Sequence, residues 1–578
     1  MIYVSEEAIS LRKIYWGLVV VFMFFLLITA GCIFKSQEKK SQDKENGEDA
    51  AEDAIELMLQ EMTIEQKVGQ LIMAYFDGPE FGADLAAAMR ELHLGGVILF
   101  SSTGNIENPA QVAALTADIQ NAALKSGGIP LFIAADQEGG IVARFWEGVT
   151  VFPGNMALGA AGSEDLARLT AAVLACELRT MGVNLNFAPV VDVNNNPDNP
   201  VIGVRSFGSD PALVSRLGAA MVAPYREAGV LATAKHFPGH GDTAVDSHYG
   251  LPQIDHDWAR LSSVELPPFQ AMVDARVPAV MVGHILMPAL TGSAELPASL
   301  SPQAISYLRE EMGFEGLILS DSMSMGAITE NWGLEEACVK AIQAGIDMIV
   351  FGPWSGVEAG DRGRIFRALK GAVEQGTISP ERLDQAVKRI LCAKKEYGIL
   401  DDPLPQADSL SELAAAKHLE VARRVARESV TLVRDRGGVI PLDPAGTVPL
   451  IWPAEQEEAL APLLDECPFL QPQLLPLGAS GAETAALFEA LRSAPLVLAG
   501  SYNLRSYPAW VELINALEAE TDVVLLAMAS PYDILAVPGA TACLAAYSDC
   551  RASVQALAGI LRGALEPRGS LPVTIPGL

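Results

Sequence analysis

Eight short apolar segments, each followed by a longer segment with helical spacing, constrain the fold of this chain more than any other feature. They alternate from residue 62 to about residue 397. The segments are GQLIMAYF, GGVILF, PLFIAA, NLNFAPVV, VLATAKH, VPAVMVGH, EGLILS and IDMIVFG, which begin at Gly69, Gly95, Pro130, Asn184, Val230, Val277, Glu315 and Ile346. Most are continuous apolar runs, as is typical of parallel strands buried on both faces. Eight β-then-α units predict a (β/α)8 barrel over residues 56–400.

Polar side chains stand at the ends of five of the eight predicted strands. They are Asp136, Asp192, the pair Lys235 and His236, His284, and Asp321. In a (β/α)8 barrel the C-terminal ends of all strands open onto the face that carries the active site. We therefore expect these side chains to meet at one rim of the barrel.

The remaining third of the chain predicts a second α/β domain over residues 416–578. The Pro- and Asp-rich segment DDPLPQADS, which begins at Asp401, predicts a linker over residues 401–415. Beyond it, VPLIWP, PLVLAGSYN, DVVLLAMASPYD and TACLAAYS alternate with helical segments, and GSLPVTIP is the last candidate strand. This alternation predicts a layered parallel sheet. The domain has no phosphate-binding loop, so we expect it to support the barrel or shape the cleft.

The N-terminal segment predicts export and a membrane anchor. Arg12 and Lys13 precede an apolar stretch over residues 14–30, which is typical of a signal segment over residues 1–32. The ending TAGC resembles a bacterial lipoprotein signal, in which Cys32 becomes the lipidated N-terminus. An uncleaved signal anchor is the alternative, because the stretch is nearly long enough to span a bilayer. Residues 33–55 are charged and polar and predict a flexible tether, so either interpretation puts the later domains outside the cytoplasmic membrane.

Charge and cysteine spacing exclude some partners. The net charge of −31 argues against a nucleic-acid partner, since such proteins present basic surfaces to phosphate. It also leaves the N-terminal anchor as the only expected contact with a membrane. None of the cysteines forms a CxxC pair, which disfavours a cysteine-based metal site.

The segment KHFPGHGDTAVDSHYG, residues 235–250, concentrates groups that transfer protons. It holds three of the seven histidines of the chain, on a stretch too rich in Gly and Pro for a regular helix or strand. Asp246 and His248 lie two residues apart, so the carboxylate can fix one imidazole nitrogen while the other gives or takes a proton. Metal binding by the His and Asp residues of this loop is the competing interpretation. Pro238, Gly239 and Gly241 break the helical spacing that zinc ligands need, so we expect no metal.

Asp321, in the segment LILSDSMSMGAI, is the candidate nucleophile. It directly follows a predicted buried strand, where a carboxylate can be held ionised at the barrel mouth. The alternative role is a structural cap of the following helix. Retaining glycosidases combine a nucleophile with an acid/base group, usually two carboxylates. Here the acid/base group would be His248.

Four motifs resemble glycoside hydrolase family 3, in its β-N-acetylglucosaminidase branch. They are KHFPGHGDTAVDSHYGLP, SDSMSM, DQEGG and VIGVRSFG, and the resemblance extends more loosely to ESVTLVRDRGGVIPL and RGSLPVTIP in the second domain. It implies a (β/α)8 barrel followed by an αβα sandwich, and no cofactor. It implies Asp321 as nucleophile, His248 as acid/base and Asp246 as its orienting partner. The sugar would be bound by Asp136, Arg144, Arg205, Lys235 and His236.

The sequence departs from the family motif at one position, and three alternatives for its function stay open. Ser322 stands where many family members have a second aspartate. The expected activity is hydrolysis of terminal N-acetylglucosamine from saccharides, with cell-wall fragments as the expected source. The alternatives are a phosphorylase or a β-glucosidase of the same family, and a non-catalytic sugar-binding lipoprotein. We expect His284 to line the pocket floor, and His93, His256 and His418 to be structural.

Overall fold

The computed structural model describes residues 52–354, 358–442 and 446–578. The predicted signal segment, Cys32 and the tether up to residue 51 lie outside the described residues. Residues 52–61 are helical and belong to a unit that ends at Met62, whereas Thr63–Leu578 form a second unit. Among the described residues, no helix has both the length and the apolar character needed to cross a membrane.

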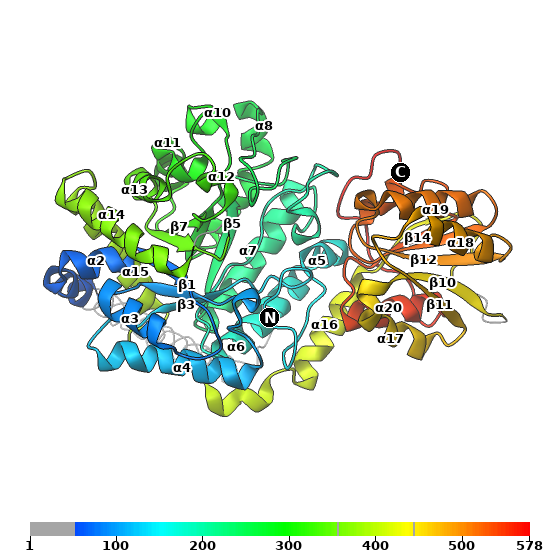
Figure 1. Cartoon of the computed structure of the whole chain (residues 1–578), viewed down its shortest axis with the longest axis horizontal. Coiled ribbons are helices and arrows are strands. Elements are labelled where there is room, and N and C mark those ends of the chain that lie inside the picture. Colours follow the sequence, from blue (N-terminus) through cyan, green and yellow to red (C-terminus); the bar gives the residue numbers. More distant parts are fainter. Residues whose placement is uncertain (1–51, 355–357, 443–445) are drawn as a thin grey trace, which may run out of the picture. The chain divides into compact units, whose positions relative to one another are not determined.

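The first part of the larger unit is a closed barrel of eight parallel strands, as predicted (Figure 1). Each strand pairs with the next along the chain, and β8 closes the ring against β1. The strands are β1 (Ile72–Tyr75), β2 (Gly96–Ile98), β3 (Phe132–Ala135), β4 (Leu185–Asn186), β5 (Leu231–Phe237), β6 (Ala279–Val282), β7 (Leu317–Ser322) and β8 (Met348–Phe351). Nearly every strand residue is buried, which is why the sequence shows continuous apolar runs.

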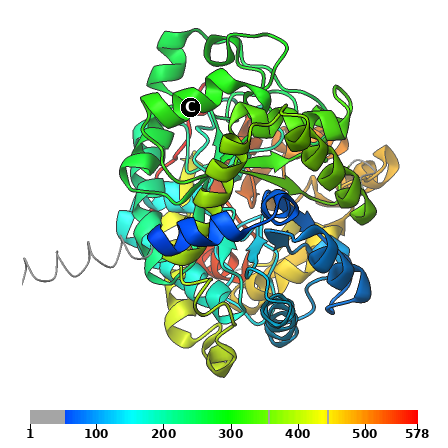
Figure 2. The same ribbon diagram turned by 90° about the vertical axis from the view of Figure 1, so that its left-hand side faces the viewer.

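Helices return the chain from each strand to the next and surround the barrel (Figure 2). The main ones are α3 (Ala83–Leu92), α4 (Pro109–Lys125), α6 (Glu164–Thr180), α7 (Pro211–Glu227), α9 (Pro267–Asp274), α11 (Pro302–Ser306), α13 (Leu334–Ala344) and α14 (Arg362–Glu374). Shorter helices stand in the loops or flank the barrel, namely α2 (Ile64–Gln70), α5 (Asn155–Ala161), α8 (Trp258–Ser263), α10 (Pro288–Thr291) and α12 (Gly326–Thr329). A long helix, α15 (Pro380–Glu396), follows α14.

Local sequence signals explain where several of these helices begin. Asp210 accepts a hydrogen bond from a first-turn N–H group of α7, and Pro211 follows as the first helical residue. Ser379 and Pro380 play the same parts at the start of α15. A side-chain acceptor followed by proline is a strong helix start, because it satisfies one free N–H group and removes another.

The second domain contains a six-stranded sheet in the order β11-β10-β12-β13-β14-β9. Its strands are β9 (Thr431–Asp435), β10 (Val448–Pro453), β11 (Leu470–Leu475), β12 (Leu496–Ser501), β13 (Asp522–Ala527) and β14 (Ala542–Ala545). Helices α18 (Gly481–Leu491) and α19 (Pro508–Glu518) lie on one face, and α17 (Glu457–Glu466) and α20 (Arg551–Leu561) on the other (Figure 1). Helix α16 (Ala416–Ser429) precedes the sheet. The αβα sandwich is thus confirmed, although β9 runs antiparallel to β14 and the sheet is mixed.

The prediction of a last strand at GSLPVTIP was wrong. Residues 569–576 form no strand and lie instead against loops of the barrel. The N–H of Ser209 donates to the carbonyl of Pro572 at 2.9 Å, and the N–H of Thr574 donates to Ser209 Oγ at 3.1 Å. Pro572 and Pro576 lack the N–H group that a strand ladder requires, which explains why the segment does not extend the sheet.

Candidate active site

A cavity of about 220 Å³ opens among the C-terminal ends of the barrel strands. Its volume is below the usual range for drug-sized ligands and suits one small ring. The side chains that carry the chemistry are Asp136, Arg144, Arg205, Lys235, His236, His240, Ser247, His248, Asp321, Ser322 and Trp354. The wall also has apolar members, among them Phe100, Phe187 and Met281. Strand ends far apart in the sequence therefore converge on one pocket.

Five charged side chains of alternating sign form one continuous network at one side of this pocket. Asp136 accepts hydrogen bonds from Arg144 at 2.9 Å and from Lys235 at 2.8 Å. Lys235 also contacts Glu138 at 2.7 Å, and Arg205 donates to both Glu138 oxygens at 2.8 and 2.9 Å. We call these five residues the charged cradle. Three basic and two acidic groups leave it with an excess of hydrogen-bond donors for an uncharged, hydroxyl-rich ligand.

Burial makes the pairing within the charged cradle obligatory. The side chains of Lys235 and Glu138 are each only 2% exposed. Burial acts to raise the pKa of Asp136 and Glu138, but Lys235, Arg144 and Arg205 nearby hold both pKa values below the ordinary range. The pKa of Arg205 is raised, because Glu138 outweighs the effect of burial. A buried charge without such partners would be strongly unfavourable, so these side chains are fixed before any ligand arrives.

Asp192 and His236 form a second buried pair, of which His236 lines the pocket and Asp192 does not. Asp192 is fully buried and contacts His236 Nδ1 at 2.8 Å, and it accepts the backbone N–H of His240 at 2.7 Å. His240 in turn contacts Ser247 Oγ through Nε2 at 2.9 Å. Burial lowers the pKa of His240 to about 4, so its ring is neutral at physiological pH. Asp192 therefore fixes both His236, which lines the pocket, and the start of the loop that follows.

Asp246 and His248 lie together on the loop between β5 and α8, as the spacing predicts. Asp246 Oδ1 lies 2.7 Å from His248 Nδ1 and accepts the backbone N–H of His248 at 2.9 Å. Both side chains are about a quarter exposed, at 24% and 27%. Partial burial acts to raise the pKa of Asp246, but the hydrogen bonds from His248 hold it below its ordinary value. Since Nδ1 faces Asp246, Nε2 is the nitrogen that can exchange a proton with a ligand.

Asp321 lies in β7 and lines the same pocket as His248. Its Oδ1 accepts the backbone N–H of Ser322 at 2.7 Å. Burial acts to raise its pKa, but the neighbouring histidines, with His236 foremost, lower it below its ordinary value. The carboxylate is therefore ionised at neutral pH, as a nucleophile requires. Ser322, which replaces a second aspartate, contacts Ser324 Oγ at 2.8 Å and accepts the N–H of Gly352.

Seven of the predicted site residues line the pocket, namely Asp136, Arg144, Arg205, Lys235, His236, His248 and Asp321. Asp246 is not part of the wall and reaches the pocket only through His248. His284 does not line the floor, contrary to expectation. It is fully buried and contacts Ser299 Oγ and the carbonyl of Ser322, so it lies behind the wall and supports β7.

Several residues of the site were not predicted, among them His240, Ser247, Glu138 and Trp354. Glu138 belongs to the motif DQEGG, but its pairing with Arg205 crosses 67 positions of the sequence and no local spacing reveals it. Trp354 follows the eighth strand in the segment FGPW and packs against the His248 ring at a centroid distance of 4.7 Å. The sequence signal that could have revealed Trp354 is its position shortly after a predicted barrel strand.

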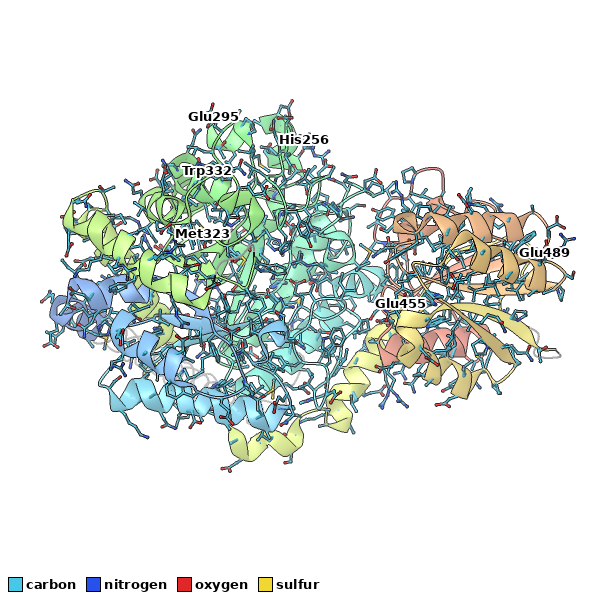
Figure 3. All side chains as sticks on the ribbon, in the orientation of Figure 1. His256, Glu295, Met323, Trp332, Glu455 and Glu489 are labelled. Carbon is cyan, nitrogen blue, oxygen red and sulfur yellow. The ribbon has the colours of Figure 1, made fainter. Side chains whose placement is uncertain are left out.

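A cluster with metal-ligand chemistry joins the loop to residues on either side of α8. Ligand-type atoms of Asp242, His256 and Glu265 lie within 4.8 Å of one another. Arg260 donates to Asp242 at 3.3 Å and to Glu265 at 3.1 Å, and thus already supplies positive charge to both carboxylates. Figure 3 shows His256 near α8, whereas Met323, two residues beyond Asp321, is fully buried. The cluster fastens the loop to α8, and His256, expected to be structural, takes part in it through Asp242 at 2.7 Å.

Known proteins resemble this chain in sequence and in fold. The model of the glycosyl hydrolase family 3 N-terminal domain matches residues 63–393. A β-hexosaminidase A of Pseudoalteromonas piscicida is 37% identical over 432 residues, which cover 68% of this chain and 71% of that protein.

Two solved structures extend the comparison to the second domain. A family 3 β-N-acetylglucosaminidase from Paenibacillus sp. str. FPU-7 has a TM-score of 0.82 at 38% identity, over 89% of this chain and 99% of that one. A β-glucoside phosphorylase, BglX, bound to 2FGlc has a TM-score of 0.78 at 26% identity, over 91% and 96%. The barrel, its charged pocket and these matches define the class: the chain is a glycoside hydrolase. It belongs to glycosyl hydrolase family 3.

Proposed function

We propose that the protein is an exo-acting β-N-acetylglucosaminidase that retains anomeric configuration. The observation that carries the proposal is a small pocket lined by an ionised Asp321 and by His248, whose Nδ1 contacts Asp246. A cavity of about 220 Å³ has room for one sugar ring, which suits a terminal sugar and not the middle of a chain. The β-hexosaminidase and β-N-acetylglucosaminidase matches support N-acetylglucosamine as that sugar.

Each group has a defined part in this reaction. The charged cradle and His236 hold the hydroxyl groups of the sugar, so that the anomeric carbon faces Asp321. Asp321 attacks that carbon while His248 Nε2 gives a proton to the departing oxygen, which breaks the glycosidic bond. The same nitrogen then takes a proton from water, and the resulting hydroxide releases the sugar from Asp321. Asp246 fixes the tautomer and the orientation of the His248 ring.

Phosphorolysis is the second candidate. The similarity to a β-glucoside phosphorylase supports it, and the acid/base group is a histidine, which carries no negative charge to repel phosphate. In that reaction phosphate would replace water in the second step and release a sugar phosphate. The same residues serve both reactions.

One assay with four arms tests the proposal. p-Nitrophenyl N-acetyl-β-glucosaminide and p-nitrophenyl β-glucoside are each supplied with and without inorganic phosphate. We expect rapid turnover of the N-acetylglucosaminide without phosphate, with free N-acetylglucosamine as the product. A preference for the glucoside would overturn the sugar assignment, and turnover that depends on phosphate would establish the second candidate.

We further propose that the enzyme is exported, anchored through Cys32, and acts on cell-wall fragments. The apolar stretch that ends in TAGC supports the anchor, and the family matches support the saccharide substrate. Cys32→Ser should leave an unprocessed precursor that no longer incorporates labelled palmitate. Equal labelling of the two proteins, or none in either, would favour an uncleaved anchor instead.

A further inference from the structure

The loop that carries Asp246 and His248 is held by the residues that follow the candidate nucleophile. Helix α12 begins at Gly326, five positions after Asp321. The N–H of Gly326 donates to the carbonyl of His248 at 3.0 Å, and the N–H of Ala327 donates to the carbonyl of Ser247 at 3.2 Å. First-turn N–H groups have no partner within their own helix. Here two of them find their acceptors in the loop.

The short segment between Asp321 and Gly326 is itself fixed. The N–H of Met323 donates to the carbonyl of Val350 at 2.9 Å, and that of Met325 donates to the carbonyl of Ser322 at 3.0 Å. Gly326, Ala327 and the residues between them and β7 are buried. The start of α12 is therefore a rigid extension of the strand that carries Asp321.

The close approach depends on the missing side chain of Gly326. A Cβ atom built on Gly326 would lie 2.8 Å from the carbonyl oxygen of His248 and 3.0 Å from the carbonyl carbon and oxygen of Tyr249. These are backbone atoms, so no side-chain rotation can relieve the contact. Because the loop is partly exposed and α12 is buried, the loop is the part that would move away.

We infer that Gly326 is a positioning residue, which sets the location of the acid/base histidine relative to Asp321. The inference deepens the proposed function and rests on it. A retaining mechanism needs the two catalytic groups at a fixed separation, and a displacement of about 1 Å costs about 100-fold in rate. Gly326 does not line the pocket and acts through the carbonyl of His248.

Gly326→Ala tests the inference, with Gly333→Ala as its matched control. Gly333 lies seven positions further on, is exposed, and a Cβ there would meet no atom within 4 Å. Two rates are compared: turnover of the disaccharide N,N′-diacetylchitobiose, and the pre-steady-state burst of dinitrophenolate from the dinitrophenyl glycoside. A good leaving group departs without a proton, so its burst does not need a well-placed acid.

We expect Gly326→Ala to lower disaccharide turnover roughly 10- to 100-fold, while the burst rate stays within a few-fold of wild type. Azide, which needs no base, should accelerate release of the trapped sugar. Gly333→Ala should match wild type in every measurement. Equal loss on both substrates, or no loss on either, would overturn the inference.

A second variant covers the case in which Gly326→Ala does not fold. Ala327→Gly keeps both N–H donors but loosens the first turn of α12. The same selective loss on the disaccharide should appear at roughly two- to fivefold, and an unselective or absent loss would contradict the inference. If wild type itself releases no N-acetylglucosamine, the proposed function fails, which is a distinct result from a failure of the Gly326 role.

Discussion

The charged cradle and the loop that carries Asp246 and His248 both contribute to the same pocket, but they are held in place in opposite ways. Lys235 and Glu138 are almost inaccessible and joined to Arg205 and Asp136 by several short contacts from strand ends. Asp246 and His248 are about a quarter exposed and lie on a loop without regular structure. The part proposed to hold the sugar is fixed by buried ion pairs, whereas the part proposed to transfer protons is positioned by a few contacts. Damage to the first should reduce binding and stability together, and damage to the second should reduce only chemistry.

The largest effect on turnover should come from a change at Asp321, which lines the pocket together with both regions. Asp321→Ala removes the proposed nucleophile, so turnover should fall by several orders of magnitude on every substrate, including those with good leaving groups. Because the side chain is near the surface of the pocket and not within the core, the melting temperature should change little. A purified variant that keeps more than about a tenth of the activity would remove Asp321 from the role of nucleophile.

Glu138→Gln should affect binding and stability together. The change leaves Lys235 and Arg205 buried with one carboxylate fewer, which costs roughly 3–5 kcal/mol when a buried pair is broken. We expect a raised KM and a clearly lower unfolding midpoint in urea. Glu295→Gln is the control, since Glu295 is exposed at the edge of the barrel (Figure 3) and should leave both quantities unchanged. An unaltered midpoint for Glu138→Gln would show that the cradle is not fixed by its own pairing.

Removal of metal should have the smallest effect of all. Arg260 already pairs with Asp242 and Glu265, so the loop needs no ion to hold these carboxylates. Dialysis against EDTA is expected to leave turnover unchanged. Activity that disappears on dialysis and returns with zinc would mean that the loop is held by a metal and not by Arg260.

A contrast between buried and partly exposed segments also explains which strands could be predicted from the sequence. All eight barrel strands were predictable, because a strand buried on both faces needs an unbroken apolar run. Strands β9 and β11 were missed because they are the edges of their sheet: β11 has four exposed residues in its middle and a proline among them. Edge strands lack the apolar pattern on which the prediction depends.

For the site, residues that stand directly at strand ends were predictable, and pairings across the barrel were not. Asp136, Lys235 and Asp321 follow apolar runs, so the fold alone brings them to one rim. The contact of Glu138 with Arg205 depends on how two loops fold over the rim, and His284 is displaced behind the wall by its bonds to Ser299 and Ser322. Such contacts are tertiary and leave no periodic trace in the sequence.

The proposed role of His248 rests on the Asp246 contact at Nδ1 and on the shared pocket with Asp321, and His248→Ala tests it most directly. The measurement compares N,N′-diacetylchitobiose with the dinitrophenyl glycoside, each with and without azide. Turnover of the disaccharide should fall roughly 10²- to 10⁴-fold, while the dinitrophenolate burst persists, the glycosyl-enzyme accumulates, and azide restores turnover with the β-azide as product. A uniform loss on both substrates without rescue by azide would contradict the account and make His248 a sugar-binding residue.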